Sequence, residues 1–301
     1  MPSLLVGTSE GLMSLTERGS ERELAAQPVT GLSGAGGDWW ALAGERRLLR
    51  GDGHTWHEVQ TLDGPAATCV GVTSAGTLVG TAEGHLLRFD GDRLRIVDGF
   101  DNAASRDDWY TPWGGPADVR SLCESDDGIF VNVHVGGILR SSDGATSWRP
   151  TIDIHADVHQ VIAGRRRGQL LAATARGLGV SDDAGATWRF HTAGLPATYL
   201  RAVAVSGGSI LVTASSGPGG SRSGVHRTSL DADRPFQQCD GGLPADFGKN
   251  IDTHCLAASG ERVAIGAPQG TVHWSPDGGG TWDVLARDVG SITCLAFAED
   301  G

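Results

Sequence analysis

Four segments of this 301-residue chain each place two side chains capable of chemistry two positions apart. The pairs are Asp118 and Arg120, Asp157 and His159, Tyr199 and Arg201, and Asp252 and His254. In an extended strand, residues i and i+2 point to the same side, so each pair presents its two side chains together. Buried or half-buried ionisable groups carry a desolvation cost and are usually paired or functional, so these segments indicate a site.

Acid–base chemistry with anion binding fits these residue types. A histidine paired with an aspartate acts as a general acid or base, and a tyrosine can donate or accept a proton. We therefore expect catalytic roles for His159, His254, Asp157, Asp252 and Tyr199. Arg120 and Arg201 can bind a carboxylate or phosphate through their forked guanidinium groups, beside Asp118. The alternative is that these opposite charges merely neutralise one another in a wet channel.

A divalent metal ion is a second use of the same residues. Imidazole ligands suit Zn, Fe, Cu or Ni, and nearby aspartates can orient the rings. The expected ligands are His134, His159 and His254, joined by His155 or Asp157. His155, Asp157 and His159 lie on one side if this segment is extended.

Internal repeats predict the elements that position these residues. Each repeat has a first strand like V-x-x-L-A, a second like L-x-V-G-T, a third like G-L-x-R-S, and a fourth that starts near a tryptophan. Aligning the seven first strands gives one channel position, occupied by Thr293, Thr30, Thr68, Arg120, His159, Arg201 and His254. Two residues earlier come Ser291, Pro28, Ala66, Asp118, Asp157, Tyr199 and Asp252. Only the last four repeats therefore carry the pairs.

The two ends of the chain complete one another. Residues 291–297 match a first strand with no second strand after it, while residues 4–8 and 11–15 match second and third strands. We therefore expect a single all-β domain over 1–301, a seven-bladed β-propeller with four-stranded blades. One blade is shared between 1–24 and 290–301, closed by pairing of the N- and C-terminal strands.

Further residues point to the face where the first strands begin. His134 ends a second strand where sister repeats have Thr8, Thr81 or Thr174, and Asn132 replaces an apolar position in the same strand. The longest connector, 98–117, contains Trp109, Tyr110 and Trp113. These aromatic residues form either a stacking wall for a ligand or a small satellite core. We expect substrate contacts from these three residues and Asn132, on a face elaborated by long loops.

A recurring turn carries a family resemblance. Residues 181–188 and 275–282 both read S-x-D-x-G-x-T-W, with weaker copies at 141–148 and 229–236. This motif resembles the Asp-box, the repeat of bacterial neuraminidases that marks propeller blades. Asp143, Asp183, Asp231 and Asp277 are expected only to stabilise turns.

The resemblance implies the fold but not one activity. Asp-box propellers include sialidases, endoglucanases, sorting receptors and photosystem assembly factors. Sialidases have six blades, an arginine triad and a tyrosine supported by a glutamate. Here Arg120 and Arg201 are the plausible channel arginines and no glutamate accompanies Tyr199, so we do not expect sialidase activity.

Composition excludes several classes of function. The net charge of −12 argues against a nucleic-acid surface, which needs a basic stripe. No apolar run approaches membrane-spanning length, and the N-terminus lacks the features of a signal peptide. The five cysteines, without metal-type spacing, are typical of reduced thiols in a cytoplasmic protein.

We therefore expect a cytoplasmic enzyme of hydrolase or lyase type, assisted by a divalent metal or working without one. Its substrate is a small anionic or polyhydroxylated molecule in the funnel of blades 4–7. The alternative is a non-catalytic propeller that binds a ligand or serves as a protein-assembly scaffold, with a protein partner on the face carrying the long loops.

Overall fold

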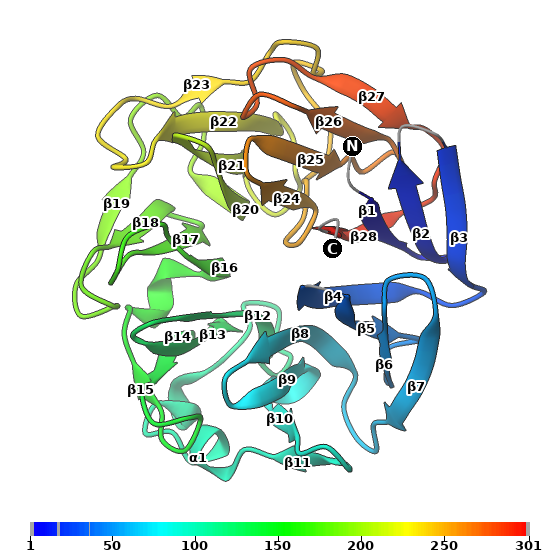
Figure 1. Ribbon diagram of the computed structural model, residues 1–301. Coiled ribbons are helices and arrows are strands. Elements are labelled where there is room, and N and C mark those ends of the chain that lie inside the picture. The colour runs from blue at the N-terminus through cyan, green and yellow to red at the C-terminus, as the bar shows by residue number, and fades with distance from the viewer. Residues whose placement is uncertain (1–2, 17–18, 36, 299–301) are drawn as a thin grey trace.

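Seven four-stranded antiparallel sheets surround a central axis in the computed structural model, which describes residues 3–16, 19–35 and 37–298 (Figure 1). The predicted seven-bladed β-propeller is therefore confirmed. We number the blades from the one that contains both ends of the chain, so that blades 2 to 7 follow in chain order. In each blade the first strand lies nearest the axis and the fourth lies at the rim.

The strands of the first four blades are as follows. Blade 1 contains β28 (Ile292–Phe297), β1 (Leu4–Thr8), β2 (Gly11–Thr16) and β3 (Gly19–Ala25). Blade 2 contains β4 (Val29–Ala35), β5 (Asp38–Ala43), β6 (Arg47–Gly51) and β7 (Trp56–Thr61). Blade 3 contains β8 (Ala67–Thr73), β9 (Gly76–Thr81), β10 (Leu86–Phe89) and β11 (Leu94–Ile96). Blade 4 contains β12 (Asp118–Ser125), β13 (Gly128–His134), β14 (Gly137–Ser141) and β15 (Arg149–Pro150).

The remaining blades and the short helices complete the fold. Blade 5 contains β16 (Val158–Ala163), β17 (Leu170–Thr174), β18 (Gly177–Ser181) and β19 (Arg189–His191). Blade 6 contains β20 (Tyr199–Ser206), β21 (Ser209–Ser215), β22 (Gly224–Ser229) and β23 (Gln237–Gln238). Blade 7 contains β24 (Leu256–Ser259), β25 (Arg262–Gly266), β26 (Val272–Ser275) and β27 (Asp283–Ala286). The helices are η1 (Ala82–Gly84), α1 (Asp98–Asp101), η2 (Arg106–Asp108) and η3 (Ile154–Ala156).

Blade 1 closes the ring by pairing strands from the two ends of the chain. β1 runs antiparallel to β28, with Leu4 opposite Phe297 and Val6 opposite Leu295. This pairing covers strand edges that would otherwise be exposed. Residues 1–2, 17–18 and 299–301 of the predicted shared blade lie outside the described residues.

The hydrophobic core is divided among the interfaces between neighbouring blades. Each cluster of buried apolar residues joins two adjacent blades; for example, Phe130 of blade 4 packs with Val158 and Leu170 of blade 5. Alternation along each strand sends successive side chains to opposite faces of a blade, so one strand contributes to two interfaces. The blades are therefore held together by packing, and the polar residues near the axis are not needed to fill this core.

The recurring turns are stabilised by their own aspartates. In blade 5, Ser181 donates to Asp183 Oδ1 at 2.9 Å, and the Thr187 backbone N–H donates to the same oxygen at 2.8 Å. Equivalent bonds form at Asp143 and Asp277. In blade 6 the carboxylate that accepts from the serine hydroxyl belongs to Asp233, while Asp231 pairs with Arg166. The turn role expected for Asp231 is therefore wrong.

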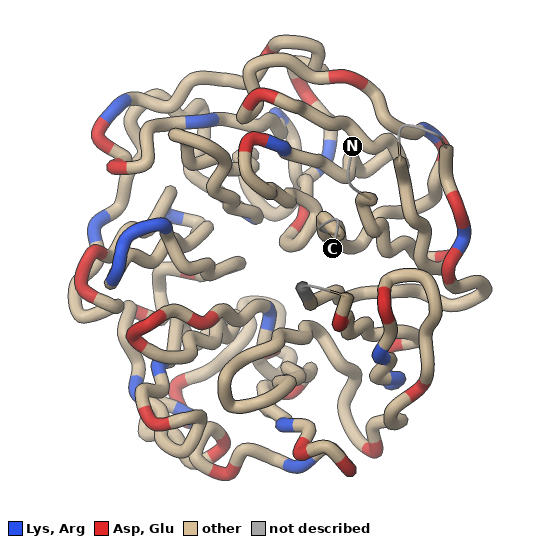
Figure 2. Tube along the Cα trace, viewed as in Figure 1, with Lys and Arg blue, Asp and Glu red and all other residues tan. Residues whose placement is uncertain are grey.

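Charged residues of both signs are interspersed around the rim of the propeller (Figure 2). Among the described residues, no helix is long and apolar enough to cross a bilayer.

Candidate functional site

Six of the seven first strands are irregular at the aligned channel position. The strand ladder skips Thr293, Thr30, Thr68, Arg120, His159 and Arg201. An extra residue in one strand is a β-bulge, which turns the bulged side chain out of the normal alternation. These positions are therefore structurally equivalent, as the repeat alignment predicts, and each side chain enters the channel from the same kind of kink.

Blade 7 departs from this pattern. Its first strand begins at Leu256, and His254 occupies a turn with φ of 67°. The alignment that places His254 within a first strand is therefore wrong for this blade. The turn reaches across the channel: His254 Nε2 donates to the Arg120 carbonyl at 2.9 Å, and Thr253 Oγ1 donates to the Arg201 carbonyl at 3.0 Å. His254 thus ties blade 7 to blade 4, and its Nε2 is engaged with backbone.

Three of the bulged side chains also donate to the backbone of the next blade. Thr68 donates its hydroxyl to the Val119 carbonyl of the next blade, and Thr293 donates to the Val29 carbonyl. His159 does the same with Nδ1, which donates to the Leu200 carbonyl at 2.5 Å. In Thr68, Thr293 and His159, one side-chain atom therefore holds the next blade through a hydrogen bond. The second ring nitrogen of His159, Nε2, takes no part in this link.

His134, Asp157 and His159 form a compact buried cluster on blades 4 and 5. His134 Nε2 lies 2.9 Å from Asp157 Oδ1, and His159 Nε2 lies 3.7 Å from the same oxygen. His134 Nδ1 lies 3.6 Å from Asp118 Oδ1. The exposed fraction is 1 % for His134 and 0 % for His159, while the Asp157 side chain is 25 % exposed. Asp157 is therefore the member of the cluster that solvent or a ligand can reach.

Burial and hydrogen bonding set the protonation states of this cluster. Burial lowers the pKa of His159 to about 3, so its ring is neutral. Burial acts in the same direction on His134, but the neighbouring carboxylates of Asp118 and Asp157 outweigh it and raise the pKa of that ring. Burial acts to raise the pKa of Asp157, but the adjacent His134 imidazole outweighs it and the pKa is lowered. The Asp157 carboxylate is therefore ionised. Of the two imidazoles beside it, His134 binds a proton more readily than a free histidine does, and His159 binds one less readily.

The Tyr199 ring packs against His159 of the same cluster at a tilted angle. Its ring centroid lies 4.6 Å from that of His159, which in turn lies 5.3 Å from that of His134. Burial raises the pKa of Tyr199, so the phenol keeps its proton. The Arg201 guanidinium lies 5.5 Å from the Tyr199 ring centroid. The structure thus brings Tyr199, His159, His134 and Asp157 together, but it leaves His254 and Asp252 outside this group.

A cavity of about 460 Å³ opens on the face where the first strands begin. Its walls include Asp118, Arg120, Arg201 and Asp252 on one side and Thr30, Thr68 and Thr293 on the other. Arg120 Nε lies 3.0 Å from Asp118 Oδ2, and Arg201 contacts Asp252 at 2.5 Å. Asp118 therefore belongs both to this funnel and to the buried cluster.

The long connector between blades 3 and 4 divides its aromatic residues between two roles. Trp109 packs against Phe100, with ring centroids 5.3 Å apart, in the apolar cluster between these blades. Trp113 is 65 % exposed and lies 5.5 Å from the His134 ring centroid. Tyr110, 41 % exposed, approaches His155. Trp109 is thus a core residue, whereas Trp113 covers the buried cluster.

Two further expected site residues have different environments. η3 and the left-handed backbone of Asp157, with φ of 51°, replace the extended segment expected over residues 155–159. The prediction that His155 shares a side with His159 is therefore wrong, and His155 is exposed. Asn132 is fully buried on the same face of β13 as His134, and its amide atoms have no hydrogen-bond partner within the described part of the chain.

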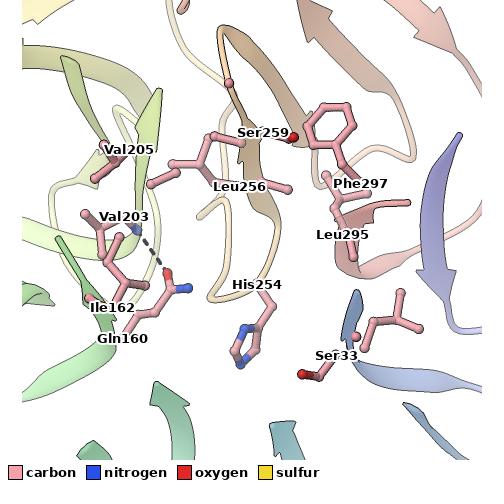
Figure 3. Close-up of a pocket in the computed structure, with 18 of the residues that line it drawn as sticks. Ser33, Gln160, Ile162, Val203, Val205, His254, Leu256, Ser259, Leu295 and Phe297 are labelled. Carbon is pink, nitrogen blue, oxygen red and sulfur yellow. Dashed lines mark hydrogen bonds between the residues drawn. The ribbon is translucent and has the colours of Figure 1, made fainter. Parts of the chain in front are cut away.

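A second cavity, of about 570 Å³, occupies the opposite end of the channel. Its wall combines apolar side chains such as Leu256, Leu295 and Ile162 with the polar residues Ser33, Gln160 and Ser259 (Figure 3). His254 lines both cavities and points into this one. Sequence reasoning missed this cavity and the role of Thr253. The apolar first-strand residues at 256 and 295 signal the cavity, but no pattern signals the turn at 253.

Comparison with known proteins supports the fold. The sequence matches no profile of a known protein family and no curated protein sequence. A structure assigned provisionally as a 6-phosphogluconolactonase from Bacteroides uniformis is 14% identical, with a TM-score of 0.70 over 98% of this chain and 99% of that one. YCF48 bound to a D1 peptide is 14% identical, with a TM-score of 0.62 over 99% and 89%. A nidogen/laminin complex is 10% identical, with a TM-score of 0.56 over 99% of both chains. At these identities the likeness concerns the propeller fold alone.

Proposed function

We propose that the protein is a hydrolase of a small anionic ester or lactone that binds in the funnel where the first strands begin. Blades 1 to 4, 6 and 7 line this funnel, so the expected lining by blades 4–7 alone is wrong. The observation that carries the proposal is the ionised, partly exposed carboxylate of Asp157, held by buried His134 next to a funnel with two arginines. A funnel of about 460 Å³ is within the range of small-molecule sites. The provisionally assigned 6-phosphogluconolactonase is a precedent for a hydrolase on this architecture.

Arg120 and Arg201 bind the anionic group of the substrate in this proposal. Each is already paired with an aspartate, Asp118 or Asp252, so an incoming carboxylate or phosphate competes for donors that are held in position. Arginine presents several N–H donors in a planar fork, which allows one guanidinium to serve both partners. The arginines therefore orient the substrate above the buried cluster.

Asp157 acts as the general base. It accepts a proton from water while the water oxygen attacks the acyl carbon, and the acyl C–O bond breaks. Asp157 then returns the proton to the leaving oxygen, so the products are an acid and an alcohol. His134 positions the carboxylate, and Tyr199 keeps its proton and donates to the substrate. An elimination would use the same base, and analysis of the products distinguishes the two reactions.

The test is turnover of 6-phosphogluconolactone and of small acyl esters that carry a carboxylate or phosphate, measured by proton release above the uncatalysed rate. Asp157→Asn should lower kcat by roughly 10²- to 10⁴-fold. Arg201→Gln should raise KM about tenfold or more with little change in kcat, because it removes binding common to substrate and transition state. Arg88→Gln, at an exposed position of blade 3, is the matched control. Wild-type turnover no faster than that of Asp157→Asn would overturn the proposal.

A protein-binding scaffold is the second candidate function. The exposed Trp113 and Tyr110 lie on the connector beside the funnel, and exposed aromatic residues are frequent at protein interfaces. YCF48 bound to a D1 peptide and the nidogen/laminin complex are precedents for partner binding by this fold. In this case Trp113→Ala weakens partner binding and Asp157→Asn leaves it unchanged.

For either function we propose a cytoplasmic setting. It is supported by the five cysteines, all of which are free thiols in the structure.

A further inference from the structure

The second nitrogen of His159 faces a carboxylate instead of a donor. Nδ1 carries the hydrogen, because it donates to the Leu200 carbonyl, so Nε2 carries a lone pair. His159 is 0 % exposed, and Nε2 has no hydrogen-bond partner among the described residues, although Asp157 Oδ1 lies 3.7 Å away. Two electron-rich atoms thus face each other in a buried place. Such an arrangement is unfavourable unless a cation or a proton lies between the two atoms.

His134 supplies a third atom from a neighbouring blade. Its Nε2 lies 2.9 Å from the same carboxylate oxygen, and a nitrogen of each histidine and the carboxylate all lie within 4.8 Å of one another. The other nitrogen of each ring faces an oxygen: the Leu200 carbonyl for His159, and Asp118 Oδ1 at 3.6 Å for His134. Histidines that bind metals usually have this arrangement, because the outer acceptor fixes the ring and its tautomer.

We infer that His134 Nε2, Asp157 and His159 Nε2 bind one divalent transition-metal ion, with Zn²⁺ as the best fit. Ligand atoms around tetrahedral Zn²⁺, at bonds of about 2.0–2.2 Å, lie roughly 3.3 Å apart. The distances from Asp157 Oδ1 to the two Nε2 atoms, 2.9 and 3.7 Å, bracket that value, so small side-chain movements complete the site. Two imidazoles exclude Mg²⁺ and Ca²⁺ as preferred ions, since both favour oxygen ligands.

Three protein ligands leave one position of a tetrahedral ion for a further ligand. The two histidines are buried, whereas the Asp157 side chain is 25 % exposed, and Asp118 connects the cluster to the funnel wall. Three protein ligands with one open position are typical of catalytic zinc, which binds water there. Metal binding would replace the contact between His134 Nε2 and Asp157, and a metal-bound water would then supply the nucleophile in place of water activated by Asp157. Metal binding itself goes beyond the proposed hydrolysis, because it is measured on the protein alone, whatever substrate the funnel accepts.

A second group on blades 1 and 2 provides an internal control. Glu21, Glu23 and His54 also lie within bonding reach of one another, but Glu21 is exposed and the His54 side chain is 65 % exposed. His54 already pairs with Glu23 at 3.1 Å. This group has no buried unpaired ligand atom, and we expect no specific metal binding there.

The experiment is calorimetric titration of the chelator-treated full chain with ZnSO₄, together with the visible absorption of the Co²⁺ form. We expect one equivalent of Zn²⁺ and the intense spectrum of a tetrahedral Co²⁺ site. His159→Asn should lower the affinity at least about 100-fold, because the amide can still donate to the Leu200 carbonyl but replaces Nε2. Asp157→Asn should do the same, because it replaces a carboxylate ligand with a neutral amide. His54→Asn is the matched control and should bind as the wild type does.

The outcomes separate this inference from the proposed function. Stoichiometric binding that His159→Asn and Asp157→Asn abolish supports the metal site, even if no substrate is turned over. A wild-type protein that binds no ion near one equivalent overturns it, and so does unchanged affinity in folded His159→Asn and Asp157→Asn. Turnover in the presence of chelator would leave the hydrolase proposal intact while contradicting a catalytic metal.

Discussion

The two sides of the central channel are built on the same strand irregularity but carry different side chains. Blades 1 to 3 place a threonine at the bulge, whereas blades 4 to 6 place an arginine or a histidine there. Thr68 and His159 show what the change means. Each gives one hydrogen to the backbone of the next blade, but the imidazole has a second nitrogen 3.7 Å from Asp157.

The comparison separates what the scaffold needs from what it does not. One donor is enough to connect neighbouring blades, and a threonine hydroxyl supplies it at little cost in burial. The extra nitrogen of His159 and the carboxylate of Asp157 must be desolvated without contributing to that link. Two residues before the bulge, blades 1 to 3 have Ser291, Pro28 and Ala66, which carry no charge. We therefore assign the functional role to the polar atoms of blades 4 and 5 that do not link blades, such as Nε2 of His159.

The largest expected effect comes from comparing a substitution at His159 with one at the equivalent Thr68. His159→Asn retains a donor for the Leu200 carbonyl, so the free energy of unfolding should change little, while loss of the metal ligand Nε2 beside Asp157 should lower turnover roughly 100-fold. Thr68→Val leaves the Val119 carbonyl without its donor and should lower the free energy of unfolding by about 1–2 kcal/mol with turnover unchanged. Urea unfolding and steady-state kinetics on both variants check this. Equal losses of turnover in the two variants would show that His159 is only a link between blades.

The aromatic connector offers a second way to sharpen the comparison. Trp109→Ala removes a ring packed against Phe100 and should lower the free energy of unfolding by about 2–4 kcal/mol. Trp113→Ala, at a 65 % exposed position over His134, should change it by less than about 0.5 kcal/mol but alter ligand binding in the funnel. Thermal unfolding and calorimetry with inorganic phosphate distinguish the two. A large loss of stability in Trp113→Ala would assign both tryptophans to the core.

Most of the fold follows from the repeats in the sequence. The seven units, the pairing of β1 with β28 and the equivalence of the bulged residues all depend on local patterns that recur at the same place in each repeat. His134 was identified in the same way, because it stands where Thr8, Thr81 and Thr174 end their strands.

These patterns did not predict which of the candidate site residues lie close together. His254 looked equivalent to His159, but the strand is replaced by a turn whose acceptors lie on blades 4 and 6, more than fifty residues away in the chain. The segment before His159 looked extended, yet η3 and the left-handed backbone of Asp157 turn His155 away. In both cases the decisive hydrogen bonds join distant blades, and a single sequence carries no periodicity that reports them.

The smallest expected effect concerns the pH dependence of stability at His254, compared with its non-titrating equivalent on blade 1. Burial lowers the pKa of His254, so below pH of about 6.5 the unfolded chain takes up a proton that the folded chain does not. Stability from this residue is therefore present above that pH and is lost as the pH falls, by at most about 1.4 kcal/mol per pH unit.

His254→Gln retains a donor for the Arg120 carbonyl but does not titrate, so its free energy of unfolding should fall less steeply between pH 7.5 and 5.5 in urea unfolding. Thr293→Ser, which keeps the hydroxyl link to blade 2, should follow the wild-type slope. If His254→Gln also follows that slope, the histidine titrates alike in both states, and its bond across the channel does not depend on a neutral ring.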